Sequence, residues 1–97
     1  MAKGYWVSCY RAVHDQEKLA AYAKLAGPAI EKHGGRFVIR GPAMEVHDQG
    51  VAGRTVVVEF ENVEAAKKAH SSAEYHEALE HLRGAVDRDF RIVEGVH

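Results

Sequence analysis

The order in which strand and helix patterns alternate is the feature that most constrains the fold of this chain. A long amphipathic helical pattern lies between the first and second strands, and a helical region broken in two lies between the third and fourth. Aromatic and β-branched residues predict strands over residues 3–11, 36–40, 54–60 and 89–93. The resulting β-α-β-β-α-β order is the ferredoxin-like arrangement. We therefore predict an α+β fold, in which a four-stranded antiparallel sheet carries both helical regions on one face.

Capping residues mark the ends of the first helix. Asp15 is a good N-cap, and the pair Gly34-Gly35 closes the helix after His33, because one glycine takes the left-handed conformation. Pro28 lacks a backbone donor, so we expect the helix to kink or restart near Gly27.

The second helical region carries two further N-cap patterns. Asn62 predicts a helix that runs to about residue 70, and Ser71 with Glu74 has the capping-box form for another helix. The second strand is expected to end at Gly41-Pro42, and residues 44–46 are a candidate extension of its pairing after a bulge.

Each strand has two registers, and the more apolar one is predicted to face the helices. It contains Tyr5, Val7, Cys9, Phe37, Ile39, Val56, Val58, Phe60, Phe90 and Ile92. The opposite register mixes apolar and charged residues, namely Trp6, Ser8, Tyr10, Arg36, Val38, Arg40, Thr55, Val57, Glu59, Arg91 and Val93. A sheet face open to water is normally polar, so we expect a second copy of the chain to cover this face and form a homodimer.

Composition restricts the class of protein. The 97 residues suffice for one domain, which we place over residues 1–97. Thirteen Lys and Arg against fourteen Asp and Glu give a net charge of −1, which disfavours nucleic acid or an anionic membrane as a partner. No apolar run is long enough for a membrane span or a signal peptide. The single cysteine excludes an internal disulfide framework and fits a reducing compartment, so we expect a cytoplasmic protein.

Several short segments together carry a family resemblance. They are Gly-Tyr-Trp at residues 4–6, Tyr22, Pro28, and the residues of 33–37, 54–60, 65–66, 72–75 and 93–96. With them the chain resembles, over nearly its whole length, the bacterial domain-of-unknown-function family numbered 1330, within the dimeric α+β barrel superfamily. Ala69-His70, Ala73 and Asp48-Gln49 depart from the family pattern, which often has an aromatic pair, a proline and Glu-Gly there. The resemblance implies a homodimer of ferredoxin-like subunits and no settled activity. Other members of the superfamily include cofactor-independent oxygenases, isomerases and haem proteins.

The first candidate site lies on the mixed face of the sheet. Arg36 and Arg40 can hold a carboxylate or an enolate there, within reach of Tyr10. Glu59 or Tyr10 is then a candidate catalytic group for proton transfer. The alternative is an ion-pair network across the dimer interface, without any chemistry.

The second candidate site lies between the sheet and the helices. Tyr5, Cys9, Tyr22, His70 and Tyr75 can line a cavity there, with Tyr22 and Tyr75 as substrate-binding residues and His70 as a catalytic candidate. The alternative is ordinary core packing, in which the tyrosine hydroxyls find backbone partners and Cys9 is a small buried hydrophobe.

Metal and cofactor signatures are not found in the sequence. His76 and His81 are five residues apart and fall on different faces of a helix, and the sequence has no Cys-x-x-Cys or His-x-x-x-His pair. We therefore expect no metal, and no haem, flavin or nicotinamide cofactor.

Two functional hypotheses remain. The first is a cytoplasmic homodimer that binds a small molecule, including the case of a cofactor-independent enzyme acting on a compact anionic or aromatic metabolite. The second is a non-catalytic interaction or structural module, in which the same residues only seal the dimer. Replacement of Arg40 by alanine is expected to separate them, because it affects either the ligand response or the dimer.

Overall fold

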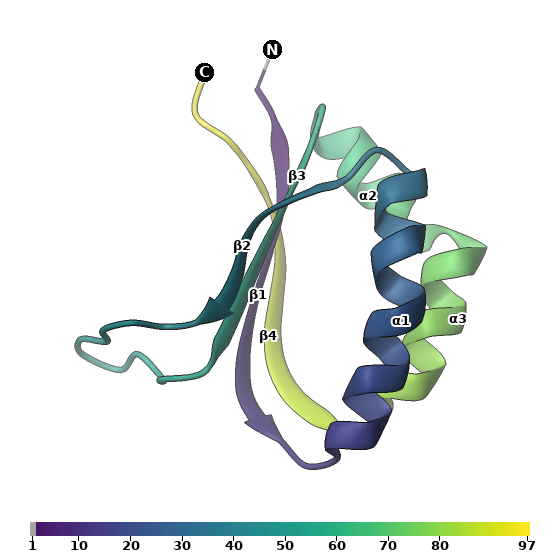
Figure 1. The fold of residues 1–97 in the computed structure, drawn as a ribbon. Helices are drawn as coiled ribbons and strands as arrows, with labels where there is room; N and C mark the ends of the chain where they lie inside the picture. Colours follow the sequence, from purple (N-terminus) through teal and green to yellow (C-terminus); the bar gives the residue numbers. More distant parts are fainter. Residues whose placement is uncertain (1) are drawn as a thin grey trace.

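The computed structural model describes residues 2–97 and confirms the ferredoxin-like class. Its elements, in chain order, are β1 Gly4–Val13, α1 Gln16–Lys32, β2 Arg36–Pro42, β3 Arg54–Phe60, α2 Val63–Ser71, α3 Ala73–Leu82 and β4 Val86–Glu94. The strands form one antiparallel sheet in the order β2-β3-β1-β4. All three helices cover one face of this sheet, and the other face is open (Figure 1). Within residues 2–97, no helix combines the length and the apolar character that crossing a membrane requires.

Helix α1 begins and ends as its capping residues predict. The Asp15 carboxylate accepts a hydrogen bond from the backbone N–H of Lys18 at 3.0 Å, and Gly34 takes a left-handed φ of 85° after the last turn. The expected restart near Gly27 is wrong, because the helix runs through Pro28 without interruption. Pro28 and Lys24 are both exposed, so the Lys24 carbonyl that loses its helical donor lies where water can bond it.

The second helical region differs from the prediction by one residue. The Asn62 side chain caps α2 by accepting from the backbone N–H of Ala65 at 2.8 Å, as expected. The cap of α3, however, is Ser72, whose hydroxyl accepts from the backbone N–H of Tyr75 at 3.2 Å. Ser71 is still the last residue of α2, so its backbone is helical and cannot take the extended conformation of an N-cap.

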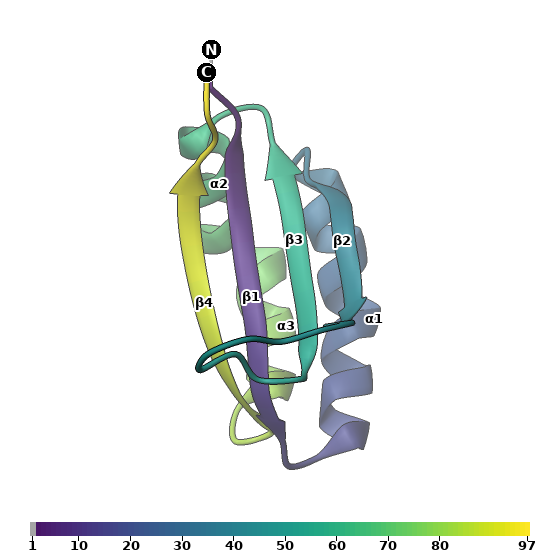
Figure 2. The same ribbon diagram turned by 90° about the vertical axis from the view of Figure 1, so that its left-hand side faces the viewer.

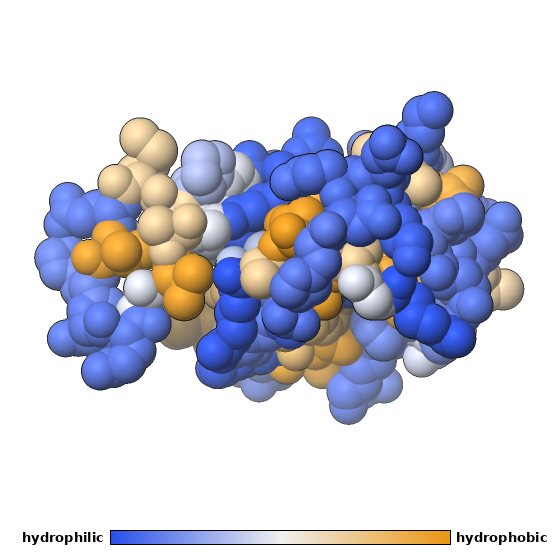
Figure 3. Space-filling model, turned by 90° about the horizontal axis from the view of Figure 1, so that it is seen from below, coloured by the Kyte–Doolittle hydropathy of each residue, from blue (hydrophilic) through white to orange (hydrophobic). Residues whose placement is uncertain are grey.

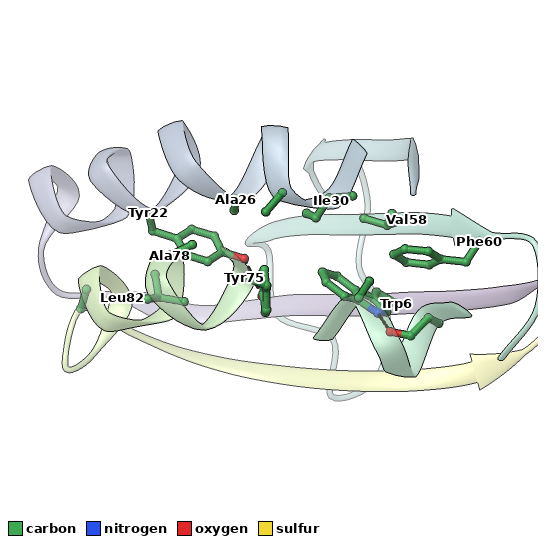
Figure 4. Packing of buried hydrophobic residues seen from close by; sticks show 13 residues of the cluster. Trp6, Tyr22, Ala26, Ile30, Val58, Phe60, Tyr75, Ala78 and Leu82 are labelled. Carbon is green, nitrogen blue, oxygen red and sulfur yellow. Dashed lines mark hydrogen bonds between the residues drawn. The ribbon is translucent and has the colours of Figure 1, made fainter. Parts of the chain in front are cut away.

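Strand β1 turns its even-numbered residues toward the helices, which is the opposite of the predicted register. A side chain at Gly4 would lie 2.5 Å from the Asn62 carbonyl oxygen, so only glycine allows α2 to approach the strand here. Trp6 is only 2% exposed, and its indole N–H donates to the Ala66 carbonyl at 2.9 Å (Figure 4). Consequently Ser8 and Tyr10 also point inward, and Tyr5, Val7 and Cys9 lie on the open face, where Cys9 is exposed.

In strand β2, the side-chain directions predicted for Ile39 and Arg40 are also wrong. Phe37 pairs with Val58 and Ile39 pairs with Val57, so the register shifts by one residue at Val38. This bulge sends Ile39 to the open face, where it is 52% exposed, and turns Arg40 toward the helix side. The predicted registers of β3 and β4 are correct.

The connection between β2 and β3 is an irregular loop, so the predicted strand extension at residues 44–46 is wrong. The loop leaves the edge of the sheet and passes in front of the open face (Figure 2). It exposes the apolar side chains of Met44, Val46 and Val51, and Met44 is 93% exposed. Apolar atoms of this projecting loop are visible at the left of Figure 3.

Replacement of Gly35 by alanine tests the tight packing where α1 leads into β2. The new Cβ would lie 2.5 Å from a methyl group of Ile30 and 2.9 Å from the Phe60 ring, so we expect Gly35→Ala to lower the free energy of unfolding by about 1–3 kcal/mol. Gly41→Ala in the same strand is the matched control, because among residues 2–97 no atom other than those of its two chain neighbours lies within 4 Å of the new Cβ. Urea denaturation measures both variants, and equal stability of the two would contradict this packing.

Candidate functional site

A cavity of about 250 Å³ lies between α1 and the sheet. Half of the α1 residues that line it are small, namely Ala20, Ala23, Ala26 and Gly27. Residues of this size leave space where larger side chains would fill the gap between the helix and the strands. Aromatic side chains such as Trp6 and Phe90 contribute apolar walls on the sheet side.

Arg88 of β4 brings a positive charge into this cavity. Its guanidinium donates to the Tyr75 hydroxyl at 3.0 Å, to the Tyr22 hydroxyl at 3.4 Å and to the Ser8 hydroxyl at 3.5 Å. Within residues 2–97 no carboxylate lies close enough to form an ion pair with Arg88. The guanidinium is half-buried, and the groups that hold it are neutral: these hydroxyls and the aromatic rings of Tyr22 and Phe90, whose centres lie 5.4 Å and 4.8 Å away.

The ionisation of these groups follows from burial. Burial raises the pKa of Tyr22, and the neighbouring Tyr75 raises it further. Burial likewise raises the pKa of Tyr10, although Arg88 opposes this shift. For Arg88 burial acts to lower the pKa, but the surrounding tyrosine oxygens outweigh it and the pKa lies above its usual value. At neutral pH the site therefore contains a guanidinium cation and protonated hydroxyl groups.

Two more arginines stand at the edge of the cavity. Arg40 and Arg54 both line it and are exposed, and the Arg40 guanidinium lies 4.5 Å from the centre of the Phe37 ring. The cavity lining within residues 2–97 includes no carboxylate and no imidazole. The electrostatic character of the cavity is therefore positive, and it fits a ligand that carries negative charge.

The first predicted site is divided between the two faces of the sheet. Tyr10 and Arg40 belong to the cavity, and Arg36 and Glu59 lie on the open face. There Arg36 donates to Glu59 at 2.8 Å and the Tyr5 hydroxyl donates to Glu59 at 3.0 Å. These two bonds hold the pKa of Glu59 below its usual value. The prediction that the four residues share one face is wrong, because β1 has the opposite register and β2 has a bulge.

The second predicted site is brought together only in part. Tyr22 and Tyr75 meet through their hydroxyl oxygens at 2.7 Å (Figure 4). His70 does not line the cavity; its ring packs on Trp6, Tyr75 and Phe90 on the side toward α2. Tyr5 and Cys9 are on the open face and take no part.

Sequence reasoning missed Arg88, Ser8 and Arg54. Arg88 precedes the strand predicted from residue 89, whereas β4 begins at Val86 and pairs Arg88 with Tyr10. The signal was the spacing of two residues between Arg88 and Phe90, which places both side chains on the same face of a strand. Within residues 2–97 no cluster of three or more His, Cys, Asp or Glu side chains is placed to hold a metal ion.

An antiparallel sheet in the order β2-β3-β1-β4, with the helical regions of both crossovers on one face, defines a ferredoxin-like α+β protein. The chain belongs to the family described as domain of unknown function (DUF1330), whose sequence profile matches residues 3–96. A comparison with curated proteins finds no match.

Solved structures share the fold at low sequence identity. A protein of unknown function from Rhodopseudomonas palustris is 22% identical with a TM-score of 0.76, over 99% of this chain and 84% of that one. SnoaB, a cofactor-independent oxygenase from Streptomyces nogalater, is 9% identical with a TM-score of 0.67, over 100% and 96% of the two chains. A dimeric protein of unknown function from Bacteroides fragilis is 15% identical with a TM-score of 0.55, over 95% of each chain. At these identities the similarity shows the fold alone.

The burial of His70 leads to a pH dependence of stability. Burial lowers the pKa of His70 from its usual 6.5, so the unfolded chain takes up this proton at a higher pH than the folded one. The free energy of unfolding is therefore expected to fall as the pH drops below about 6.5, and to level off below the pKa of the folded state. His70→Gln removes this contribution, so the variant loses less stability than the wild type between neutral and mildly acidic pH. Urea denaturation across this range measures it, and identical pH profiles would contradict the assignment.

Proposed function

We propose that the protein is a homodimer that binds a compact anionic molecule with an apolar or aromatic body in the cavity between α1 and the sheet. The observation that carries this proposal is Arg88, a cation inside the cavity whose partners are hydroxyl groups rather than a carboxylate. A guanidinium in such surroundings gains strongly from an anion, because charge-assisted hydrogen bonds are stronger than bonds to neutral groups. The ligand supplies the missing charge.

The size and lining of the cavity support this class of ligand. Small-molecule sites typically measure about 300–1,000 Å³, so a cavity of about 250 Å³ favours a compact molecule. The aromatic walls provided by Trp6 and Phe90 suit an apolar or aromatic body. Arg40 and Arg54 at the edge favour the approach of an anion from solution.

A cofactor-independent reaction is one form of this function. The solved structures of the same fold include the cofactor-independent oxygenase SnoaB and a putative antibiotic biosynthesis monooxygenase from Nitrosomonas europaea. In this chain, the cavity supplies donors that stabilise negative charge on a bound molecule, and such stabilisation is a common catalytic contribution. The single cysteine, Cys9, is an exposed free thiol, which fits a reducing compartment such as the cytoplasm.

The open face of the sheet supports the homodimer. It carries Val7, Val57 and Val93 beside Ile39, and an apolar sheet face is normally covered. Its charged groups already have partners within the chain, because Arg36 bonds Glu59 at 2.8 Å and Arg91 bonds Asp89 at 3.0 Å. A second copy therefore covers this face without leaving those charges unpaired. The relative from Bacteroides fragilis is described as dimeric, which is in keeping with this proposal.

The alternative is a non-catalytic interaction module. The exposed apolar side chains of Met44, Val46 and Val51 on the projecting loop favour it, since apolar groups on a protruding loop suit contact with another chain. Arg40→Ala no longer separates the two hypotheses, because Arg40 borders the cavity rather than the open face. Changes at Arg88 and Val57 separate them instead.

Removal of the cavity cation tests ligand binding. We expect a compact aromatic carboxylate such as benzoate to raise the Tm of the wild-type protein, and Arg88→Met to abolish this stabilisation. Arg83→Met is the matched control, because Arg83 is exposed and pairs only with Glu80 on the surface. Thermal shift and isothermal titration calorimetry measure both effects.

A second variant tests the location of the site independently of charge. Ala23→Leu fills part of the cavity from α1, whereas Lys24→Leu places the same side chain on a neighbouring exposed position that does not line it. Loss of binding in Ala23→Leu alone supports the cavity. Equal responses of Arg88→Met and Arg83→Met, or no anion that stabilises the wild type, would refute the proposed function.

The homodimer is tested at the centre of the open face. Val57→Asp places an unpaired carboxylate on this face, so we expect the variant to be monomeric at concentrations where the wild type is dimeric. Lys67→Asp on the exposed surface of α2 is the control and is expected to leave the dimer intact. Sedimentation velocity gives the mass of each species, and a monomeric wild type would rule out this assembly.

A further inference from the structure

The protons of the two facing tyrosines can be placed by counting donors and acceptors. Tyr75 is 1% exposed, and its hydroxyl has two partners, the Arg88 guanidinium and the Tyr22 hydroxyl. The guanidinium can only donate, so the oxygen of Tyr75 accepts from Arg88. The sole acceptor left for the Tyr75 proton among residues 2–97 is the Tyr22 oxygen. Because a buried hydroxyl donor is costly without an acceptor, Tyr75 donates to Tyr22.

This assignment leaves the Tyr22 proton available to a ligand. The Tyr22 oxygen accepts from Tyr75 at 2.7 Å and from Arg88 at 3.4 Å, so its own O–H has no acceptor among residues 2–97. Tyr22 lines the cavity, whereas Tyr75 stands behind it. Ser8 also lines the cavity, and among residues 2–97 its hydroxyl only accepts, from Arg88 at 3.5 Å. Two hydroxyl donors and a guanidinium therefore converge on one part of the cavity wall.

We propose that this cluster binds the ionised oxygen of a weak oxygen acid, a phenol or an enol, with the Tyr22 O–H donating a hydrogen bond to that oxygen and Arg88 compensating its charge. The inference rests on the proposed function, since it specifies the ligand class of the same cavity. Tyr22 and Ser8 each offer one hydrogen bond, which matches an oxyanion with several lone pairs. Tyr75 is a positioning residue, because it fixes the direction of the Tyr22 proton.

The charged and titratable groups around the bound oxygen all favour its ionised form. From α1 and α3 these groups are Tyr22 and Tyr75; from the sheet they are Tyr10, Arg40, Arg54 and Arg88. The lining of the described residues contains no carboxylate to oppose the anion. His70 packs behind Tyr75, and burial lowers the pKa of its ring. Protonation of His70 at acidic pH adds one more positive charge to the same region.

The consequence is a lowered pKa of the bound molecule. An opposite charge within about 4–6 Å lowers the pKa of an acid by about 1–3 units. By linkage, the phenolate then binds about 10–1,000 times more tightly than the neutral phenol. The proton that the phenol loses passes to bulk water or buffer, so no base in the protein is required. A carboxylate already carries its charge at neutral pH, and its binding does not change the protonation of the bound molecule.

The experiment uses para-nitrophenol, whose ionised form absorbs visible light. Titration of the fully bound compound with the full-length wild-type protein is expected to show the phenolate band at a pH at least about one unit below that of the free compound. The methyl ether para-nitroanisole has nearly the same shape but cannot ionise, and we expect it to bind at least about fivefold more weakly near the pKa of the free phenol, where half of the free phenol is ionised. Neither measurement depends on a variant.

Three variants assign the effect to residues. Tyr22→Phe removes only the hydroxyl and is expected to move the pKa of the bound phenol back toward the free value. Tyr75→Phe is expected to do so to a smaller degree, since Tyr22 then loses only its orienting donor. Tyr5→Phe is the matched control, because it removes a tyrosine hydroxyl from the open face.

The outcomes separate this inference from the proposed function. If para-nitrophenol binds with an unchanged or raised pKa, or if Tyr22→Phe leaves the lowered pKa in place, the inference is overturned although an anion site survives. If neither para-nitrophenol nor benzoate binds to the wild type, both the inference and the proposed function fail. A lowered pKa that Tyr22→Phe reverses and Tyr5→Phe preserves supports the oxyanion site.

Discussion

The register of β1 is the constraint on which the rest of the structure depends. Gly4 lets α2 approach the strand, and the indole of Trp6 donates to the Ala66 carbonyl at 2.9 Å, so the even-numbered residues must face the helices. Because successive side chains alternate, this single choice places Ser8 and Tyr10 beside the cavity and sends the intervening residues to the open face. The cavity site and the proposed dimer surface thus both follow from the packing of Gly4 and Trp6 against α2.

The cavity exists because α1 is fixed by α3 rather than by the sheet beneath it. Tyr22 of α1 bonds Tyr75 in the first turn of α3, and Lys32 at the C-terminal end of α1 pairs with the adjacent Glu74. The Lys32 contact holds the pKa of Glu74 at about 2, well below its usual value. Small residues on the face of α1 that points toward the sheet then leave the cavity unfilled. Arg88 of β4 enters this cavity from the sheet and donates to hydroxyl groups of β1, α1 and α3, so four elements meet at this point.

The sequence was sufficient for the elements but not for the direction of individual side chains. Hydrophobic periodicity and caps such as Asp15 and Asn62 located every strand and helix, because these signals are local. The assignment of the β1 side chains to the two faces of the sheet was wrong because both registers of this strand are rich in aromatic and apolar residues. Periodicity alone cannot choose between two such registers. The bulge at Val38 is set by pairing with β3. Tyr22 and Tyr75 were found as cavity candidates by residue type, but Arg88 was missed, since its importance comes from partners that are 66 and 13 residues away.

The arginines on the two faces of the sheet differ in whether a carboxylate balances their charge. On the open face, Arg36 is paired with Glu59, and Tyr5 bonds the same carboxylate, so that cluster has little capacity for an external anion. In the cavity, Arg88 is surrounded by hydroxyl groups and aromatic rings, and these neutral groups compensate a buried charge less completely than a carboxylate does. The ligand-free protein therefore retains part of the desolvation cost of this cation, and a bound anion recovers it. A carboxylate of the protein beside Arg88 would stabilise the free chain and remove its affinity for an anionic ligand. An arginine inside a cavity without a carboxylate partner is therefore better evidence for a ligand than an arginine in an ion pair.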